Sequence, residues 1–200
     1  MKRIGLTLAL LAMVAAAVPA WAGDGDSVGA RNCTWCHGTS GQGYPVAPGL
    51  AAQRYQYIEN QLVSFHQHTR DNPFSRQYMW GAAANLSPRR ARDLSVYFAS
   101  LPAKAANDGD RSVAAAGRAL YEDGDPEANT VACAVCHGPN AEGIRQIPRL
   151  AGLSYFYLKR RLRQWGQGYH VAAEAPMPLV ASRLTPYEIE ALASYLSFVK

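Results

Sequence analysis

One five-residue motif occurs twice in this chain and constrains its fold more than any other feature. CTWCH at residues 33–37 is repeated as CAVCH at residues 133–137, and a glycine follows each copy. The two thiols of a CxxCH motif can form thioethers with the vinyl groups of one porphyrin, and the adjacent imidazole can bind its iron. The sequence therefore predicts two covalently bound haem c groups. The attaching residues would be Cys33, Cys36, His37, Cys133, Cys136 and His137.

Three other uses of paired cysteines fit the sequence less well. A zinc site built from both pairs would have to bridge the 96 residues between Cys36 and Cys133, which exceeds finger and ribbon spacings and gives the histidine and glycine no role. A thioredoxin-type redox site needs a βαβ context, which neither copy has. A disulfide within each CxxC pair would close too short a loop to stabilise much.

The repeat extends well beyond the motif. The two copies align at an offset of 100 positions near the cysteines and, after a two-residue deletion, at an offset of 98. Residues 48–51 (PGLA) match 148–151 (PRLA), and residues 86–88 (LSP) match 184–186 (LTP). A duplication of this length predicts two similar units joined by a linker.

The first 22 residues have the features of a secretory signal peptide. Lys2 and Arg3 precede an apolar run from Ile4 to Val18, and an AxA-like end closes at Ala22. We expect cleavage after Ala22 and export to the periplasm. An uncleaved anchor is the weaker alternative, because the apolar run is shorter than the ~20 residues of a membrane span.

Size and charge limit what the remaining chain can be. Small polar residues at 104–110 predict a linker at 102–111, between an N-terminal domain at 23–101 and a C-terminal domain at 112–200. Each domain is small enough that a buried haem would form much of its core.

The formal net charge of +5 includes two charges from the signal peptide, and no basic stripe is interleaved with aromatics. We therefore expect no nucleic-acid partner.

The pattern within each unit is helical, since no alternating strand runs occur. We expect opening helices at 27–33 and 112–121 and middle helices at 53–65 and 154–165. Ser87-Pro88 and Thr185-Pro186 each place an N-cap residue before a proline, and Thr185 can form a capping box with Glu188. The sequence therefore predicts an all-α fold.

Two methionines are the candidates for the remaining axial position of each iron. Met79 follows His37 by 42 residues and Met177 follows His137 by 40, each within the pattern MxxxAxxL(S/T). A buried methionine is usually a core residue, but the shared position in a duplicated unit favours ligation by both. The predicted metal ligands are therefore His37, Met79, His137 and Met177.

The surroundings of the two methionines differ. Pro176 and Pro178 flank Met177 and should stiffen its loop, whereas Met79 has no such neighbours. We expect both potentials to be raised by thioether ligation and to differ from one another. Further histidines do not align between the units and are expected to be solvated. They are His66, His68 and His170.

Together these features resemble the dihaem cytochromes c4. The likeness rests on the two CxxCH units, the PxLA segments that lead into a helix, and the MxxxAxxL(S/T) segments, and covers nearly the whole chain after the signal peptide. It implies two tandem cytochrome c domains related by pseudo-twofold symmetry, each a small helical fold around a covalent haem. The chain departs from the family at Arg161, where glutamine is common, and in its longer segment at 72–79.

Two features near the expected domain interface have more than one interpretation. Tyr57 and Tyr157 align with a tyrosine that lies near the haem propionates in cytochromes c4, but ordinary core packing would use them equally well. The basic run at 159–163 is by default a solvated helix face, and it could instead meet propionates or an acidic partner.

The resemblance implies an electron carrier and no enzyme, with no catalytic residues. Such a protein shuttles electrons between a respiratory donor, either a quinol-oxidising complex or a dehydrogenase, and a terminal oxidase or other acceptor. It docks transiently on these redox protein partners, and peripheral membrane association is compatible with that role. Two alternatives stay open: the electron-accepting cytochrome subunit of a dehydrogenase, and a dihaem peroxidase or thiosulfate dehydrogenase. The last of these typically uses a cysteine ligand that is absent here.

Overall fold

The computed structural model describes residues 28–169 and 176–200. Within these ranges the chain consists of helices and loops, and extended backbone pairs only at two isolated bridges. The predicted all-α fold is confirmed. None of the described helices is long and apolar enough to cross a membrane. The expected signal peptide, with its cleavage site after Ala22, and His170 lie outside the described residues.

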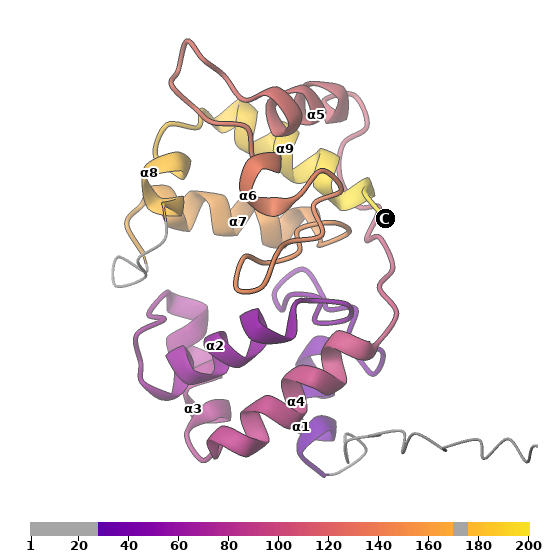
Figure 1. Ribbon diagram of the computed structural model, residues 1–200, viewed down its shortest axis with the longest axis vertical. Helices are drawn as coiled ribbons and strands as arrows, with labels where there is room; N and C mark the ends of the chain where they lie inside the picture. Colours follow the sequence, from indigo (N-terminus) through magenta and orange to yellow (C-terminus); the bar gives the residue numbers. More distant parts are fainter. Residues whose placement is uncertain (1–27, 170–175) are drawn as a thin grey trace, which may run out of the picture.

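The first half of the chain forms the lower body in Figure 1. Helix α1 (Val28–His37) contains the first CxxCH motif, and α2 (Tyr55–His66) packs against α4 (Pro88–Ser100). Between α2 and α4 the chain makes a π-helical turn, η1 (Ser75–Met79), which runs directly into α3 (Trp80–Ala83). Helix α3 lies against α2 and η1, so the segment around Met79 is held by helix contacts within this half.

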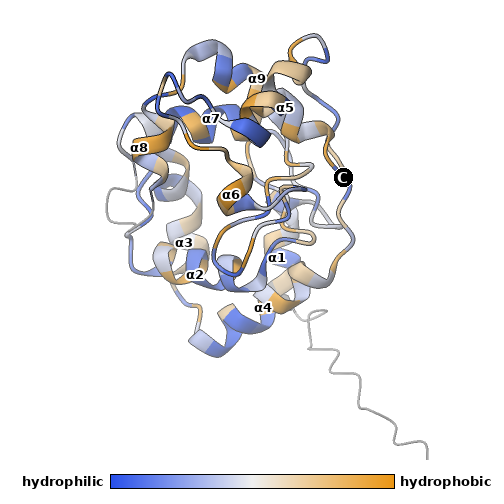
Figure 2. Cartoon of the chain, turned by 45° about the horizontal axis from the view of Figure 1, so that its top comes forward, coloured by the Kyte–Doolittle hydropathy of each residue, from blue (hydrophilic) through white to orange (hydrophobic). Residues whose placement is uncertain are grey.

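The second half forms the upper body and repeats this plan. Helix α9 (Pro186–Phe198) packs against both α5 (Ala114–Asp123) and α7 (Tyr155–Gly166). The second motif lies in α6 (Ala134–His137), whose hydrophobic ribbon is orange in Figure 2. Helix α8 (Met177–Ala181) packs on α7 as α3 packs on α2. The duplication read from the sequence is thus a duplication of helices.

The two halves differ at their beginnings. The expected opening helix at 27–33 is too short, because α1 continues through the first motif to His37. In the second half α5 and the motif helix α6 are separate elements, because Gly124 takes a φ of 74° and ends α5. A residue without a side chain adopts this left-handed conformation at little cost. The residues between Gly124 and Cys133 therefore form a loop between two helices.

The closing helices begin as the sequence predicts. The Ser87 hydroxyl accepts a hydrogen bond from the backbone N–H of Arg90 at 3.2 Å, and Pro88 opens α4. Thr185 forms the full capping box: its hydroxyl accepts from the N–H of Glu188 at 3.2 Å, and the Glu188 carboxylate accepts from the N–H of Thr185 at 2.7 Å. Both signals are local, so they could be read without the tertiary structure.

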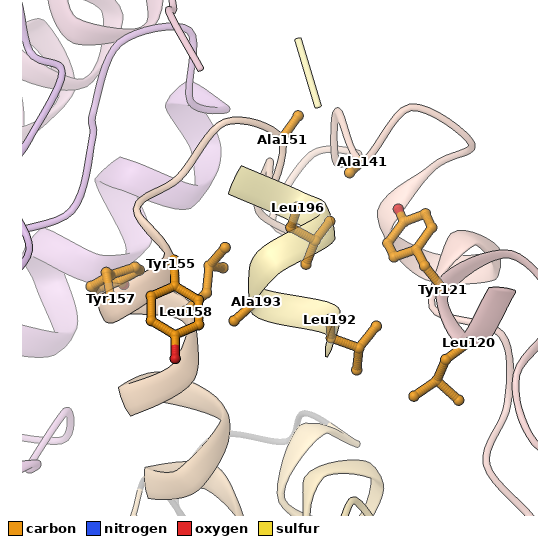
Figure 3. Packing of buried hydrophobic residues seen from close by; sticks show 10 residues of the cluster. All are labelled: Leu120, Tyr121, Ala141, Ala151, Tyr155, Tyr157, Leu158, Leu192, Ala193 and Leu196. Atoms are coloured by element: carbon orange, nitrogen blue, oxygen red, sulfur yellow. The ribbon is translucent and has the colours of Figure 1, made fainter. Parts of the chain in front are cut away.

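Each half has its own hydrophobic core. In the second half the buried side chains come from α5, α7 and α9 and include Leu120, Tyr121, Leu158, Leu192 and Leu196 (Figure 3). The first core is smaller and is built from Ala30, Ile58, Leu94 and Phe98.

Contacts between the halves follow a twofold pattern. The Gln53 side-chain amide donates to the Arg149 carbonyl at 2.8 Å and accepts from the Arg149 N–H at 2.7 Å. Positions 53 and 149 correspond to Leu153 and Gly49 in the other copy, and a Cβ placed on Gly49 would lie 3.5 Å from Leu153 Cδ2. The same two positions thus meet reciprocally, as an interface with twofold symmetry requires.

Arginines of both halves donate hydrogen bonds across this interface to backbone carbonyls of the other half. Arg54 Nε donates to the carbonyls of Glu142 at 2.8 Å and Gly143 at 2.7 Å, from the first half to the second. In the opposite direction, the Arg160 guanidinium donates to the carbonyls of residues 45 and 46 at 3.1 and 2.8 Å. Each guanidinium therefore fastens a loop of the other half.

The connection between the halves is fastened at both of its ends. The Gln42 side chain donates to the Pro102 carbonyl at 2.7 Å and accepts from the Lys104 N–H at 2.9 Å. Further along, the Asp108 carboxylate accepts from the N–H of Tyr155, the first residue of α7, at 2.8 Å. An acidic group at a helix N-terminus is favoured by the helix dipole. The connection thus lies on the protein over much of its length.

Candidate cofactor sites

The two motif histidines occupy equivalent, buried positions. His37 ends α1 and His137 ends α6, and their exposed fractions are 7% and 6%. The Nδ1–H of His37 donates to the Pro48 carbonyl at 2.8 Å, and the Nδ1–H of His137 donates to the Pro148 carbonyl at 3.0 Å. A carbonyl can only accept, so these bonds require the proton on Nδ1 and leave the Nε2 lone pair for a metal.

The charge state of both imidazoles suits the same use. Burial lowers the pKa of His37 and that of His137 below the usual value, although the bond to each proline carbonyl acts in the other direction. Both rings are therefore neutral at pH 7. Only the neutral ring offers a lone pair to a metal ion.

The cysteines of the two motifs lie in separate cores. Cys33 packs against the core of the first half and Cys133 against that of the second, and Cys36 is exposed. Burial raises the pKa of the Cys133 thiol to about 11. Because the two pairs lie in different halves, they do not form a common zinc site. Within the described chain no disulfide joins the cysteines.

The donor set of each motif fits a covalently attached haem. Two thiols and an imidazole come from one short helical segment, and the imidazole has its second nitrogen fixed by a backbone carbonyl. This is the combination that two thioether bonds and one axial iron ligand require. The two sites match in every one of these features, including the proline whose carbonyl orients the ring.

Met79 is held by the residue that follows it. It is the half-buried last residue of η1, and the next residue, Trp80, donates its indole N–H to the Arg70 carbonyl at 2.9 Å. The Trp80 ring also stacks on His68, with ring centroids 4.0 Å apart and 10° between the planes. We expected Met79 to lack the support that prolines give Met177. No proline flanks Met79, and the structure places an anchored indole beside it instead.

Met177 is the half-buried first residue of α8. Pro176 precedes the helix and Pro178 lies in its first turn, where a missing N–H costs nothing. In both halves the alanine four residues after the methionine is fully buried, Ala83 at 0% and Ala181 at 2% exposed. The repeated MxxxA pattern therefore marks equivalent positions in space as well as in sequence.

Of the histidines outside the motifs, the two that the structure describes, His66 and His68, are exposed, as expected. His66 Nδ1–H donates to the Ala83 carbonyl at 3.2 Å, and the ring of His68 covers Trp80. Both therefore support the segment around Met79 from outside.

Tyr57 and Tyr157 meet between the two halves. Both hydroxyls share one guanidinium, that of Arg70, which reaches Tyr157 from the first half (Figure 3 shows Tyr157 beside the purple ribbon of that half). The sequence marked the tyrosines because they align, but it did not mark Arg70. The counterpart of Arg70 at an offset of 100 is His170, so the repeat contained no signal for it.

Comparisons with known proteins agree with this geometry. The family model described as cytochrome c matches residues 114–200. Cytochrome c4 of Thiocapsa roseopersicina is 32% identical over 82% of this chain and 85% of its own length. A thiosulfate dehydrogenase electron acceptor of Thiomonas intermedia is 33% identical over 98% of this chain and 91% of its own length.

A solved structure has the same fold. The structure of cytochrome c4 from Acidithiobacillus ferrooxidans superposes with a TM-score of 0.78 at 31% identity, covering 84% of this chain and 98% of that chain. Since that structure is matched over almost its whole length, the likeness includes both halves and their arrangement.

Proposed function

Because this chain belongs to the cytochrome c4 family of electron-transfer cytochromes and carries two covalently bound haem c groups, we propose that it shuttles electrons in the periplasm. The observation that supports this best is the equivalence of the two sites. Each has a neutral imidazole oriented by a proline carbonyl and a methionine in the same position of the repeat. Each haem, when bound, supplies an iron that gains or loses one electron.

Met79 and Met177 are the proposed sixth ligands. Both are half-buried, both precede a buried alanine by four residues, and each is held by a rigid neighbour, an anchored indole or a pair of prolines. Rigid placement of the ligands keeps reorganisation small when charge changes at the site. A closed coordination sphere also excludes small reactants, which is why we propose an electron carrier and no enzyme.

The proposed domains are residues 23–101 and 112–200, with residues 102–111 as the connection and residues 1–22 as a signal peptide cleaved after Ala22. Separate cores in the two halves support this division. Gln42 hydrogen-bonds Pro102 at the start of the connection, and Asp108, near its end, hydrogen-bonds Tyr155 of the second half. These two contacts support the proposed limits of the connection.

Partners are proposed to dock where the motifs reach the surface. Trp35 and Val135, the middle residues of the two motifs, are 86% and 75% exposed. Each haem attachment is therefore close to solvent on its own half, so a donor and an acceptor can use different halves. We propose a quinol-oxidising complex or a dehydrogenase as donor and a terminal oxidase as acceptor, through small interfaces with charged rims.

Spectroscopy and kinetics on the holoprotein test this proposal. Both ferric haems should show the weak far-red band of methionine ligation, and the reduced protein should not bind carbon monoxide. The protein should be reduced by a membrane quinol-oxidising complex and reoxidised by a terminal oxidase. Carbon monoxide binding at either haem of the native protein would contradict a closed carrier.

A second candidate function is that of an electron-accepting partner of one dehydrogenase. It is favoured by the similarity to the Thiomonas thiosulfate dehydrogenase electron acceptor. Capture of a dehydrogenase from a periplasmic extract, followed by reduction of both haems on addition of that enzyme's substrate, would support it. Reduction at the same rate without the captured enzyme would exclude it.

A further inference from the structure

The equivalent surfaces beside the two motifs carry different side chains. On the first half, Arg31 and Trp35 are four residues apart on α1 and therefore share a face of that helix, and Trp35 is 86% exposed. On the second half the same two positions are Val131 and Val135, which are exposed as well. An indole in this position contributes little to packing within its own half. An exposed tryptophan beside a guanidinium is the composition found at the centre of protein interfaces.

The first turn of α4 adds positive charge beside α1. The two helices share the first core. Burial raises the pKa of the Cys33 thiol and the positive charge of Arg90 acts in the other direction, so Arg90 lies close to the motif. The Arg89 side chain is 93% exposed, although it pairs with Asp93 at 4.0 Å. Helix α1 has no acidic residue and α4 has only Asp93, so this surface is basic.

The second half has acidic and aromatic residues at the corresponding positions. At the offset of 98, Tyr187 and Glu188 stand where the first half has its two neighbouring arginines. They line a shallow pocket together with Asp123, which ends α5, and Asp125 of the following loop. Helix α5 in turn contacts the motif helix α6. The surface near the second motif is therefore acidic where its counterpart on the first half is basic.

The helices that carry these two sets of side chains lie at opposite ends of the molecule. Helices α1 and α4 are at the bottom of Figure 1 and α5 and α9 at the top, and Figure 2 keeps this order. Charges in solution are screened beyond about 10 Å at 0.1 M salt. A partner that docks at one end is therefore selected by the charges of that end.

We propose that Arg31, Trp35, Arg89 and Arg90, which we call the arginine face, bind an acidic redox protein that exchanges electrons with the first haem. Carboxylates around the redox centre of that protein pair with the three guanidinium groups, and an apolar group packs on the indole. Trp35 lies between the two cysteines that attach the haem, so a protein packed on it is close to the porphyrin. The inference rests on the proposed carrier function and gives one half a partner of defined charge.

The difference between the two ends also gives the exchange a defined route. One electron leaves the reduced member of the complex and enters the oxidised one, and no bond forms or breaks. Because the carboxylates near the second motif repel an acidic protein, that electron passes through the first haem. The second haem is then left to a partner of different surface chemistry.

The test is stopped-flow reduction of the ferric holoprotein by a reduced plant-type ferredoxin, an acidic protein whose low potential drives electrons to haem c. Hexaammineruthenium(II), a small cationic reductant, is the opposite probe. The variants are Arg31→Gln, Arg89→Gln, a triple variant in which all three arginines of the arginine face are glutamine, and Trp35→Val, which carries the side chain of the second half. Arg163→Gln removes the same charge from an exposed position on α7 and is the matched control.

The two probes should respond in opposite ways. With ferredoxin at low ionic strength, each single arginine variant should react roughly threefold more slowly and the triple variant at least ~10-fold more slowly, within the ~10–1000-fold range of electrostatic steering. Trp35→Val should weaken the complex by about tenfold, because it loses an aromatic anchor. With hexaammineruthenium(II) the arginine variants should react as fast as wild type or faster, since the arginine face repels a cation. Arg163→Gln should match wild type with both probes.

Ferredoxin rates equal to wild type in the triple variant would overturn the proposal, and if that variant does not fold, equal rates in Arg31→Gln and Arg89→Gln would do so. Binding of wild type, but not of these variants, to phosphatidylglycerol vesicles with unchanged ferredoxin rates would show that the arginine face meets an anionic membrane instead. Carbon monoxide binding to the native reduced protein would refute the closed carrier, yet slower ferredoxin reduction of the variants would still support the arginine face.

Discussion

The close crossing of α5 and α9 allows a prediction in which the same substitution, glycine to alanine, has opposite effects on stability at two positions. A Cβ placed on Gly117 of α5 would lie 2.0 Å from the carbonyl oxygen of Ala191 and 2.4 Å from its carbonyl carbon, in α9. These atoms are backbone and cannot turn aside, so we take the upper end of the ~1–3 kcal/mol cost of overpacking. The higher helix propensity of alanine compared with glycine offsets up to about 1 kcal/mol of this cost. Gly117→Ala should therefore destabilise the second half by about 2 kcal/mol.

The control is Gly81→Ala in α3, where a Cβ would meet nothing within 4 Å. This substitution should stabilise the first half by about 0.5–1 kcal/mol, because alanine loses less backbone entropy on folding. Calorimetry of the two holoproteins measures both effects, and for domains of this size about 2 kcal/mol corresponds to roughly 8–16 °C in Tm. A Gly117→Ala protein as stable as wild type would refute the described crossing of α5 and α9.

Three further predictions concern single side chains. Trp80→Ala removes the anchored indole beside Met79 and should lower the reduction potential of the haem in the first half. The potential of the haem in the second half should stay unchanged, and voltammetry resolves the two. Thr185→Ala removes a reciprocal capping box and should cost about 1 kcal/mol in urea unfolding, more than Ser87→Ala, which removes a single cap bond. Hydrogen bonds from Lys159 and Tyr155 lower the pKa of Glu190, so its stabilising contribution is present above pH ~4.3 and is lost as the pH falls through the lowered folded-state pKa. Acid titration of Glu190→Gln should accordingly show a shallower loss of stability than wild type, and an equally steep loss would contradict this.

The features that the sequence predicted correctly are local or repeated. The helix starts at Ser87 and Thr185 depend on residues three positions apart, and the two histidines are equivalent because the whole unit is duplicated. The all-α fold followed from the absence of alternating strand patterns. In each case the decisive interactions lie within a few residues or are copied between the halves.

The features that the sequence did not predict depend on contacts between distant residues. Arg70 meets Tyr157 across the interface, and nothing near either residue in the sequence indicates it. Trp80, which lies beside Met79, stacks on His68, a residue that was expected to be solvated because it does not align between the units. The sequence analysis also ended the first helix at residue 33, whereas α1 continues through the motif to His37; only in the second half does a glycine, Gly124, end the helix before the motif.

The most direct measurement is voltammetry, with carbon monoxide titration, of Met79→Ala and Met177→Ala holoproteins beside the wild type. If each sulphur ligates one iron, each variant should lose the far-red band of one haem and bind one carbon monoxide per molecule. The reduction potential of that haem should fall by on the order of 0.1 V, a fraction of the ~0.8 V range over which axial ligands set haem potentials. The other haem should be unaffected. Wild-type potentials and no carbon monoxide binding in either variant would contradict the account.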